Sequence, residues 1–87
     1  MSKYIIILSK KTQKILDTLS DDLVEPILNA ISSLEKSPRP IGCKKLKGRD
    51  AYRIRAGNYR IIYEIIDDVL IINIVTVGHR KDIYKKI

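Results

Sequence analysis

Three arginines surround a predicted hairpin turn, and their spacing indicates a binding site for an anion. Arg53, Arg55 and Arg60 alternate with apolar residues in the stretch AYRIRAGNYRIIYE, residues 51–64. The Gly-Asn pair at its centre is typical of a two-residue hairpin loop. Arginine binds phosphate and carboxylate groups through a planar fork of N–H donors. The chemistry that these residues predict is therefore the recognition of an anionic ligand.

The register of this hairpin places the three arginines on one face of a sheet, here called the arginine face. With the Gly-Asn pair as the loop, Arg55 lies opposite Arg60, and side chains alternate between the two faces along each strand. Like charges that lie opposite each other destabilise a sheet, and an anionic ligand would offset that cost. The alternative is a solvated outer face of a basic protein. The residues expected on the other face suit packing against helices: Tyr52, Ile54, Tyr59, Ile61, Tyr63 and Ile65.

A second hairpin is predicted around residues 67–68, an Asp-Asp pair, and it extends the arginine face. Pairing across this two-residue loop places Arg60 opposite Val75. Alternate residues counted from Val75 lead to His79, which is the single histidine and is expected on the same face. Arg80 then follows at the end of the strand. Packing or contact with RNA is the expected role of His79, because one histidine without a second ligand is a weak signal for a metal site.

The first half of the chain predicts one strand and two helices. Residues 3–8 form a short, β-branched apolar run that is typical of a buried strand. Ser9 is a suitable N-cap for a first helix, and residues 20–22 offer a second cap. Pro26 would bend the second helix if it lay beyond the first turn. The apolar residues of this second helix recur at helical spacing: Leu23, Val24, Ile27, Leu28, Ile31 and Leu34.

The element order predicts the fold class. Residues 37–42, SPRPIG, end the second helix as a loop, and residues 43–50 continue as a basic connector. The order β-α-α-β-β-β favours an α+β fold, with two helices packed on one face of a mainly antiparallel four-stranded sheet. The 87 residues predict a single domain over positions 1–87.

Charge predicts the class of partner. The net charge is +7, and positions 36–60 hold nine basic residues and one acid. Such an imbalance favours nucleic acid, an anionic membrane surface or an acidic protein as the partner. The basic residues of the connector are expected to contact RNA, although they could serve solubility alone: Lys44, Lys45, Lys47 and Arg49.

Cysteine usage and hydropathy predict a cytoplasmic protein. Cys43 is the single cysteine, so the chain cannot form an internal disulfide. The apolar runs are far shorter than the roughly 18 residues that a membrane span requires. The apolar run in MSKYIIIL is too short for a signal peptide.

The stretches LKG, YRIRAGNYRIIYEI and VGHRKDIY together resemble the RelE/ParE superfamily of bacterial and archaeal type II toxins, most closely its RelE branch. The resemblance covers nearly the whole chain, and its specific part is the C-terminal half. It implies a fold related to microbial ribonucleases and an endoribonuclease that cuts mRNA in the ribosomal A site without a metal or other cofactor. It also implies a RelB-like antitoxin that blocks the toxin, with operator DNA bound through the antitoxin of a hetero-oligomer.

The resemblance places the catalytic residues at Arg53, Arg55, Arg60, Arg80 and Tyr84. The best-known branch has lysines at the first two positions, and arginine keeps the charge but cannot give up a proton. RNA carries its own nucleophile, the 2′-hydroxyl. Tyr84 is the candidate general base, because neighbouring arginines would lower its pKa from the value of about 10 found in free tyrosine. Arg60 and Arg80 would hold the scissile phosphate, and the other two would bind phosphate.

Two other functions are compatible with the sequence. ParE-branch toxins poison DNA gyrase and generally lack the full set of basic residues plus tyrosine, so the presence of both Arg80 and Tyr84 favours the RelE interpretation. A catalytically inactive relative that binds RNA or an acidic protein is the other alternative. Tyr84 could then be a terminal aromatic residue that packs on the sheet, or it could stack on a base.

Overall fold

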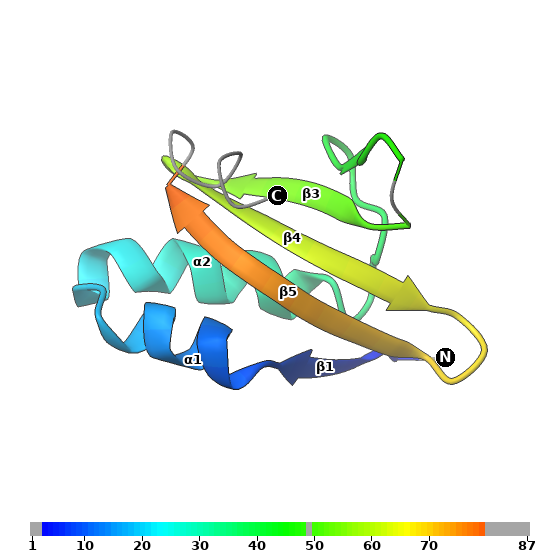
Figure 1. Cartoon of the computed structure of the whole chain (residues 1–87), viewed down its shortest axis with the longest axis horizontal. Helices are drawn as coiled ribbons and strands as arrows, with labels where there is room; N and C mark the ends of the chain where they lie inside the picture. Colours follow the sequence, from blue (N-terminus) through cyan, green and yellow to red (C-terminus); the bar gives the residue numbers. More distant parts are fainter. Residues whose placement is uncertain (1–2, 49, 80–87) are drawn as a thin grey trace.

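The fold is a sheet with two helices on one face (Figure 1). The computed structural model describes residues 3–48 and 50–79. The strands have the spatial order β1-β5-β4-β3-β2, in which β1 runs parallel to β5 and the other neighbours are antiparallel. The elements follow one another along the chain as β1 (Ile5–Leu8), α1 (Lys10–Asp17), α2 (Asp21–Ser33), β2 (Lys44–Lys45), β3 (Tyr52–Ala56), β4 (Tyr59–Ile66) and β5 (Ile71–His79).

The predicted α+β class is confirmed, but the predicted number of strands is wrong. The sheet has five strands rather than four, because Lys44 and Lys45 of the basic connector pair with Arg53 and Tyr52. Two residues are too few to show a strand pattern in the sequence. Gly42 adopts the left-handed conformation that favours glycine, with φ of +94°, just before the chain enters this strand.

Helix α1 is fixed to the sheet through a buried hydroxyl group. The Ser9 side chain accepts a hydrogen bond from the Thr12 N–H at 3.1 Å, which confirms the predicted N-cap. The Thr12 hydroxyl is fully buried and donates to the Ile74 carbonyl at 3.3 Å, with the Val75 carbonyl at 3.4 Å. Helix α1 therefore satisfies backbone acceptors in the middle of β5.

Thr12→Val is expected to lower the free energy of unfolding by about 1–3 kcal/mol, because it removes a buried donor while keeping the side-chain shape. Urea denaturation followed by circular dichroism measures this change. Thr18→Val is the matched control, because the Thr18 hydroxyl donates to the Ile15 carbonyl at an exposed position. The control is expected to change stability by no more than about 0.5 kcal/mol. Equal losses in both variants would contradict the proposed role of Thr12.

Helix α2 buries a narrower apolar stripe than its sequence predicts. Ile27 and Ile31 are buried, whereas Leu23 and Leu28 are about half exposed, at 46% and 45%. Successive helical residues differ by about 100° around the axis, so Leu28 points away from the face that holds Ile27. Pro26 lies inside the helix, which nevertheless continues to residue 33.

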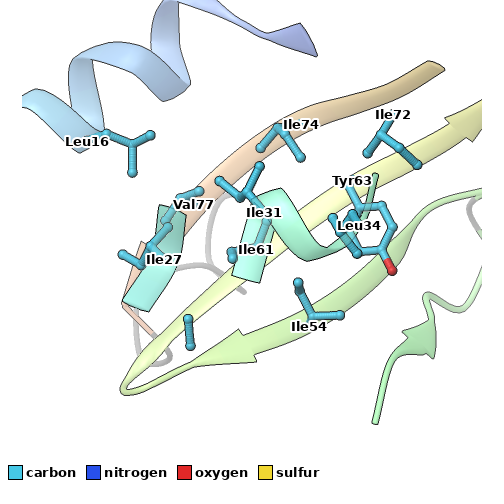
Figure 2. Packing of buried hydrophobic residues seen from close by; sticks show 11 residues of the cluster. Leu16, Ile27, Ile31, Leu34, Ile54, Ile61, Tyr63, Ile72, Ile74 and Val77 are labelled. Carbon is cyan, nitrogen blue, oxygen red and sulfur yellow. The ribbon is translucent and has the colours of Figure 1, made fainter. Parts of the chain in front are cut away.

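The core lies between the two helices and the sheet (Figure 2). Tyr63 reaches the edge of this core, and its hydroxyl donates to the Pro38 carbonyl at 2.7 Å. Burial raises the pKa of Tyr63, and the nearby Cys43 raises it further. The helical half of the chain and the strands supply the other labelled core residues: Leu16, Ile27, Ile31, Leu34, Ile54, Ile61, Ile72, Ile74 and Val77.

A polar cluster around Asp67, in the loop between β4 and β5, joins four segments of the chain. The carboxylate of Asp67 accepts hydrogen bonds from the Tyr4 hydroxyl at 2.6 Å and from Arg39 at 3.0 Å. The Arg39 guanidinium also lies over the Tyr52 ring, 5.4 Å from its centroid. These contacts hold the loop after α2 against the sheet.

The Asp67 cluster gives stability a pH dependence. The hydrogen bond from Arg39, together with that from Tyr4, holds the pKa of Asp67 below its usual value of about 3.9. Ionised Asp67 therefore stabilises the fold at pH values above its usual pKa of about 3.9. This contribution is lost as the pH falls through the lowered pKa of Asp67 in the folded protein. Asp67→Asn is expected to lower the urea midpoint at pH about 6, and much less at pH about 3. Asp68→Asn is the matched control, and equal pH profiles for the two variants would contradict this role.

Candidate functional site

The first hairpin has the register that the sequence predicts. Arg55 lies opposite Arg60, Arg53 lies opposite Ile62, and the turn residue Gly57 has φ of +62°. Side chains alternate along both strands, so the three arginines share the arginine face. This face is opposite the helices, because the alternate residues of the hairpin enter the core.

The three arginines differ in their exposure to solvent. Arg60 is buried, with 9% of its surface exposed, because it lies on the interior strand β4. Arg55 is exposed on β3, and Arg53 is intermediate. A guanidinium held in a restricted, partly dry environment interacts more strongly with an anion than one in water. Arg60 is therefore the best-preorganised cation among the described residues of this face.

Part of the arginine face is covered by the basic connector, a contact that the sequence pattern does not predict. Ile62 is fully buried on this face and packs with Ala51, Leu46 and Val75. The connector folds back on itself through a hydrogen bond from the Leu46 N–H to the Ala51 carbonyl at 2.8 Å. The signal for this covering was Leu46, an aliphatic residue among the basic residues of the connector.

The predicted register of the second hairpin is wrong. Ile66 pairs with Ile71, so the loop has four residues rather than two, and Leu70 within it has φ of +56°. The register shifts again between Ile62 and Tyr63. Arg60 consequently lies opposite Gly78 rather than Val75, and glycine presents no side chain beside it.

The corrected register moves His79 to the other face of the sheet. His79 pairs with Tyr59, and their rings meet edge to face with centroids 5.7 Å apart. The prediction that His79 shares the arginine face is therefore wrong. The longer loop changes the pairing by two residues, which leaves the faces unchanged. The shift of one residue between Ile62 and Tyr63 then exchanges the two faces.

The connector lysines lie beside the arginine strand, as their order in the sequence predicts. Lys44 pairs with Arg53 in the short strand β2, and both Lys44 and Lys45 are exposed. Lys45 also forms an exposed ion pair with Asp50 at 3.7 Å. Lys47 is exposed in the turn over positions 47–48. Two of the predicted RNA-contacting lysines, Lys44 and Lys45, therefore lie next to the hairpin.

Three predicted site residues lie outside the described residues: Arg49, Arg80 and Tyr84. Within residues 3–48 and 50–79, no group of three or more histidine, cysteine, aspartate or glutamate side chains could hold a metal ion. In the same ranges no helix is long and apolar enough to cross a membrane. Glu64, which also lies on the arginine face, accepts a hydrogen bond from its cross-strand neighbour Asn73 at 3.1 Å.

The sequence matches a known family over most of its length. Residues 6–84 match the family described as the ParE toxin of the type II toxin-antitoxin system parDE. The chain belongs to this family, within the RelE/ParE superfamily. The RelE/ParE resemblance of the sequence is thereby confirmed.

Relatives of this toxin carry the RelE name. The mRNA interferase toxin RelE of Escherichia coli (strain K12) is 31% identical over 75 residues, which cover 83% of this chain and 74% of that protein. RelE in the archaeal RelE-RelB complex from Pyrococcus horikoshii OT3 superposes with a TM-score of 0.81 and 30% identity, over 90% of this chain and 96% of that one. The matching chain of the RelB-RelE antitoxin-toxin complex from Methanococcus jannaschii superposes with a TM-score of 0.69 and is 32% identical. The match covers 92% of this chain and 96% of that one. The chain is thus a RelE-like toxin of a toxin-antitoxin system.

Proposed function

We propose that this toxin is a ribosome-dependent endoribonuclease that cuts mRNA in the ribosomal A site, in the cytoplasm, and is neutralised by a RelB-like antitoxin. The observation that carries the proposal is the opposed pair Arg55 and Arg60 on the arginine face, with Arg60 buried. The opposed guanidinium groups form a cationic surface whose planar N–H donors suit the oxygens of a phosphodiester. The E. coli relative is named an mRNA interferase.

The proposed reaction uses the 2′-hydroxyl of the RNA as the nucleophile. Tyr84 accepts the proton of that hydroxyl, and Arg60 and Arg80 hold the scissile phosphate while charge develops on its oxygens. The new bond joins the 2′-oxygen to phosphorus, the bond from phosphorus to the 5′-oxygen breaks, and the departing 5′-oxygen takes a proton from water. Arg53 and Arg55 bind phosphate and assist the departing oxygen by their charge alone, because arginine does not release a proton at neutral pH.

The basic connector would dock the toxin on ribosomal RNA. Lys44 and Lys45 are exposed beside β3, where they extend the cationic surface beyond the hairpin, and Lys47 is exposed in the turn that follows. Arg49 belongs to the same segment. Contacts of this kind release counterions from RNA, so binding to ribosomes is expected to weaken as salt concentration rises.

Inhibition of DNA gyrase is the second candidate function, because the matching family carries the ParE name. Induced expression of the chain in a bacterial host separates the two. A RelE-like activity predicts growth arrest, a rapid stop of protein synthesis and cuts within translated codons. A ParE-like activity predicts DNA damage with intact mRNA, and an inactive relative predicts normal growth.

A further inference from the structure

The two outer edges of the sheet differ in charge. Strand β2 forms one edge and carries Lys44 and Lys45, and lysines at an edge oppose pairing with a further strand. Strand β1 forms the other edge (Figure 1), and its four residues, IIIL, are all aliphatic. Within residues 3–48 and 50–79, β1 has a neighbouring strand on one side only, which is β5. The β1 edge therefore lacks the charges by which β2 opposes the addition of a strand.

The backbone of β1 directs alternate residues toward this open edge. The Ile5 N–H donates to the Leu70 carbonyl at 2.8 Å, so the backbone groups of Ile5 face β5. The N–H and C=O groups of successive strand residues point to opposite sides, so those of Ile6 and Leu8 face the open edge. Each of these two residues can therefore give one donor and one acceptor to a further strand.

The loop after α2 limits where a further strand can lie. The Tyr4 N–H also faces this edge, and it donates to the Glu35 carbonyl at 2.9 Å. The position beside Tyr4 is thereby occupied. A further strand can pair with Ile6 and Leu8, and the centre of such a pairing is Ile7.

Exposed aliphatic side chains lie on the helix-free face of β1. Ile6 and Leu8 pack against the core, so Ile5 and Ile7 point to the opposite face. The exposed fractions of Ile5 and Ile7 are 63% and 43%. Ile71 of β5 pairs with Ile5 and shares this face. A strand added at this edge would therefore remove apolar surface from water as well as satisfy backbone groups.

We propose that the β1 edge binds β1 of a second copy of this chain, in an antiparallel pairing about a two-fold axis at Ile7. Ile7 then lies opposite Ile7 of the second copy, and Ile6 lies opposite Leu8. The Ile6 and Leu8 pairs exchange backbone hydrogen bonds, and the Ile7 pair brings its side chains together on the helix-free face. The two five-stranded sheets become one continuous sheet.

The observations favour a second copy over the other occupants of such an edge. RNA requires cations, and β1 carries none. A partner strand must be aliphatic, must have a free edge of its own and must be short enough to avoid the loop at Glu35. Strand β1 of a second copy meets all three requirements, and no like charges lie opposite each other in this register. A two-fold pairing also uses both open edges at once, so it closes at a dimer.

The dimer is expected to be weak and to leave the arginine face free. Four residues on each side form a contact smaller than the roughly 1,200 Å² of a stable interface. Each copy also carries a net charge of +7, and the two charges repel. A Kd of about 10–100 µM is therefore expected. Strands β5 and β4 separate β1 from β3, so dimerisation and RNA cleavage are independent properties.

Sedimentation velocity of the full-length protein between about 1 and 300 µM, at about 0.3 M salt, measures the association. The wild type is expected to pass from monomer to dimer over this range. Ile7→Lys is expected to weaken the dimer at least about tenfold, because it places like charges directly opposite each other. Ile41→Lys is the matched control, since Ile41 is fully exposed in the loop before β2, at the other edge. It is expected to dimerise as the wild type does.

Amide hydrogen exchange tests the pairing itself. The Ile6 and Leu8 N–H groups face the open edge, so their exchange is expected to slow as the protein concentration rises. The Ile5 and Ile7 N–H groups face β5, and their exchange is expected not to depend on concentration. A second copy that packed only on the exposed side chains of Ile5 and Ile7 would not produce this alternation.

A disulfide tests the register. Ile7→Cys in a Cys43→Ser background is expected to form a covalent dimer on mild oxidation, because residues of the closer, non-hydrogen-bonded kind of pair suit a disulfide. Ile5→Cys in the same background is the control. Ile5 is more exposed than Ile7 but lies opposite Ser9 in this register, so little covalent dimer is expected.

Four results would overturn the proposed dimer. They are a wild type that stays monomeric at about 300 µM, an Ile7→Lys protein that dimerises normally, a dimer without slowed exchange at Ile6 and Leu8, and equal cross-linking through positions 5 and 7. Urea denaturation verifies that each variant is folded. Cleavage of mRNA is measured on the same samples at concentrations where the protein is monomeric, so its outcome bears on the proposed function alone.

Discussion

Arg60→Ala is expected to lower the rate of mRNA cleavage on programmed ribosomes by about 10²–10³-fold, the usual effect of removing one preorganised donor from a developing oxyanion. Arg60 is the only buried arginine among the described residues, and it lies between Arg55 and Gly78 on neighbouring strands. Its position is therefore fixed before substrate arrives. Single-turnover cleavage of mRNA bound to ribosomes measures the change directly.

Two variants separate this effect from unfolding and from a general loss of charge. Arg60→Lys keeps the charge but loses the planar fork, so an intermediate loss of about tenfold is expected. Arg39→Ala removes an arginine that contacts Asp67 and Tyr52 away from the arginine face, and it is expected to cleave at the wild-type rate. Urea denaturation verifies that each variant is folded. A folded Arg60→Ala protein with wild-type cleavage would refute the assigned role.

Ile27→Ala is expected to lower the free energy of unfolding by about 2–5 kcal/mol, because it leaves a cavity at a fully buried position. Ile27 belongs to the core between α2 and the sheet (Figure 2). This loss is a large share of the total stability expected for a small domain, about 5–15 kcal/mol. Urea denaturation measures it.

Leu28→Ala is the control for Ile27→Ala, because the two residues are adjacent in the same helix and differ mainly in burial. Leu28 is 45% exposed, and its truncation is expected to cost less than about 1 kcal/mol. The sequence pattern treats both residues as part of one apolar stripe. Similar losses in both variants would mean that α2 packs with the broader face that the pattern predicts.

The first hairpin could be predicted from the sequence because all its determinants are local. The Gly-Asn turn fixes the register, and the alternation of arginines with apolar residues then assigns the faces. The second hairpin could not be predicted in this way. Its loop includes Leu70 in a left-handed conformation, and its shifted strand is held by a hydrogen bond from Thr12, 63 residues away from Val75. Such a contact leaves no local signal.

The candidate site, like the two hairpins, could be predicted from the sequence only in part. Alternation in the hairpin indicated the arginine face, but the burial of Arg60 depends on neighbouring strands and on the connector that packs over Ile62. The position of His79 depended on the second register and was therefore predicted incorrectly. The assignment of Arg80 and Tyr84 rests on the resemblance to the RelE branch, since composition and spacing alone indicate only an anion-binding surface.

Mapping of mRNA cleavage on programmed ribosomes, with the wild type beside Tyr84→Phe, tests the proposed function most directly. The wild type is expected to cut within the codon in the A site and to leave a 2′,3′-cyclic phosphate, because the 2′-hydroxyl is the nucleophile. Tyr84→Phe is expected to bind ribosomes normally but to lose cleavage, because phenylalanine cannot accept the proton. Unchanged cleavage by Tyr84→Phe, or intact A-site mRNA with the wild type, would contradict the account.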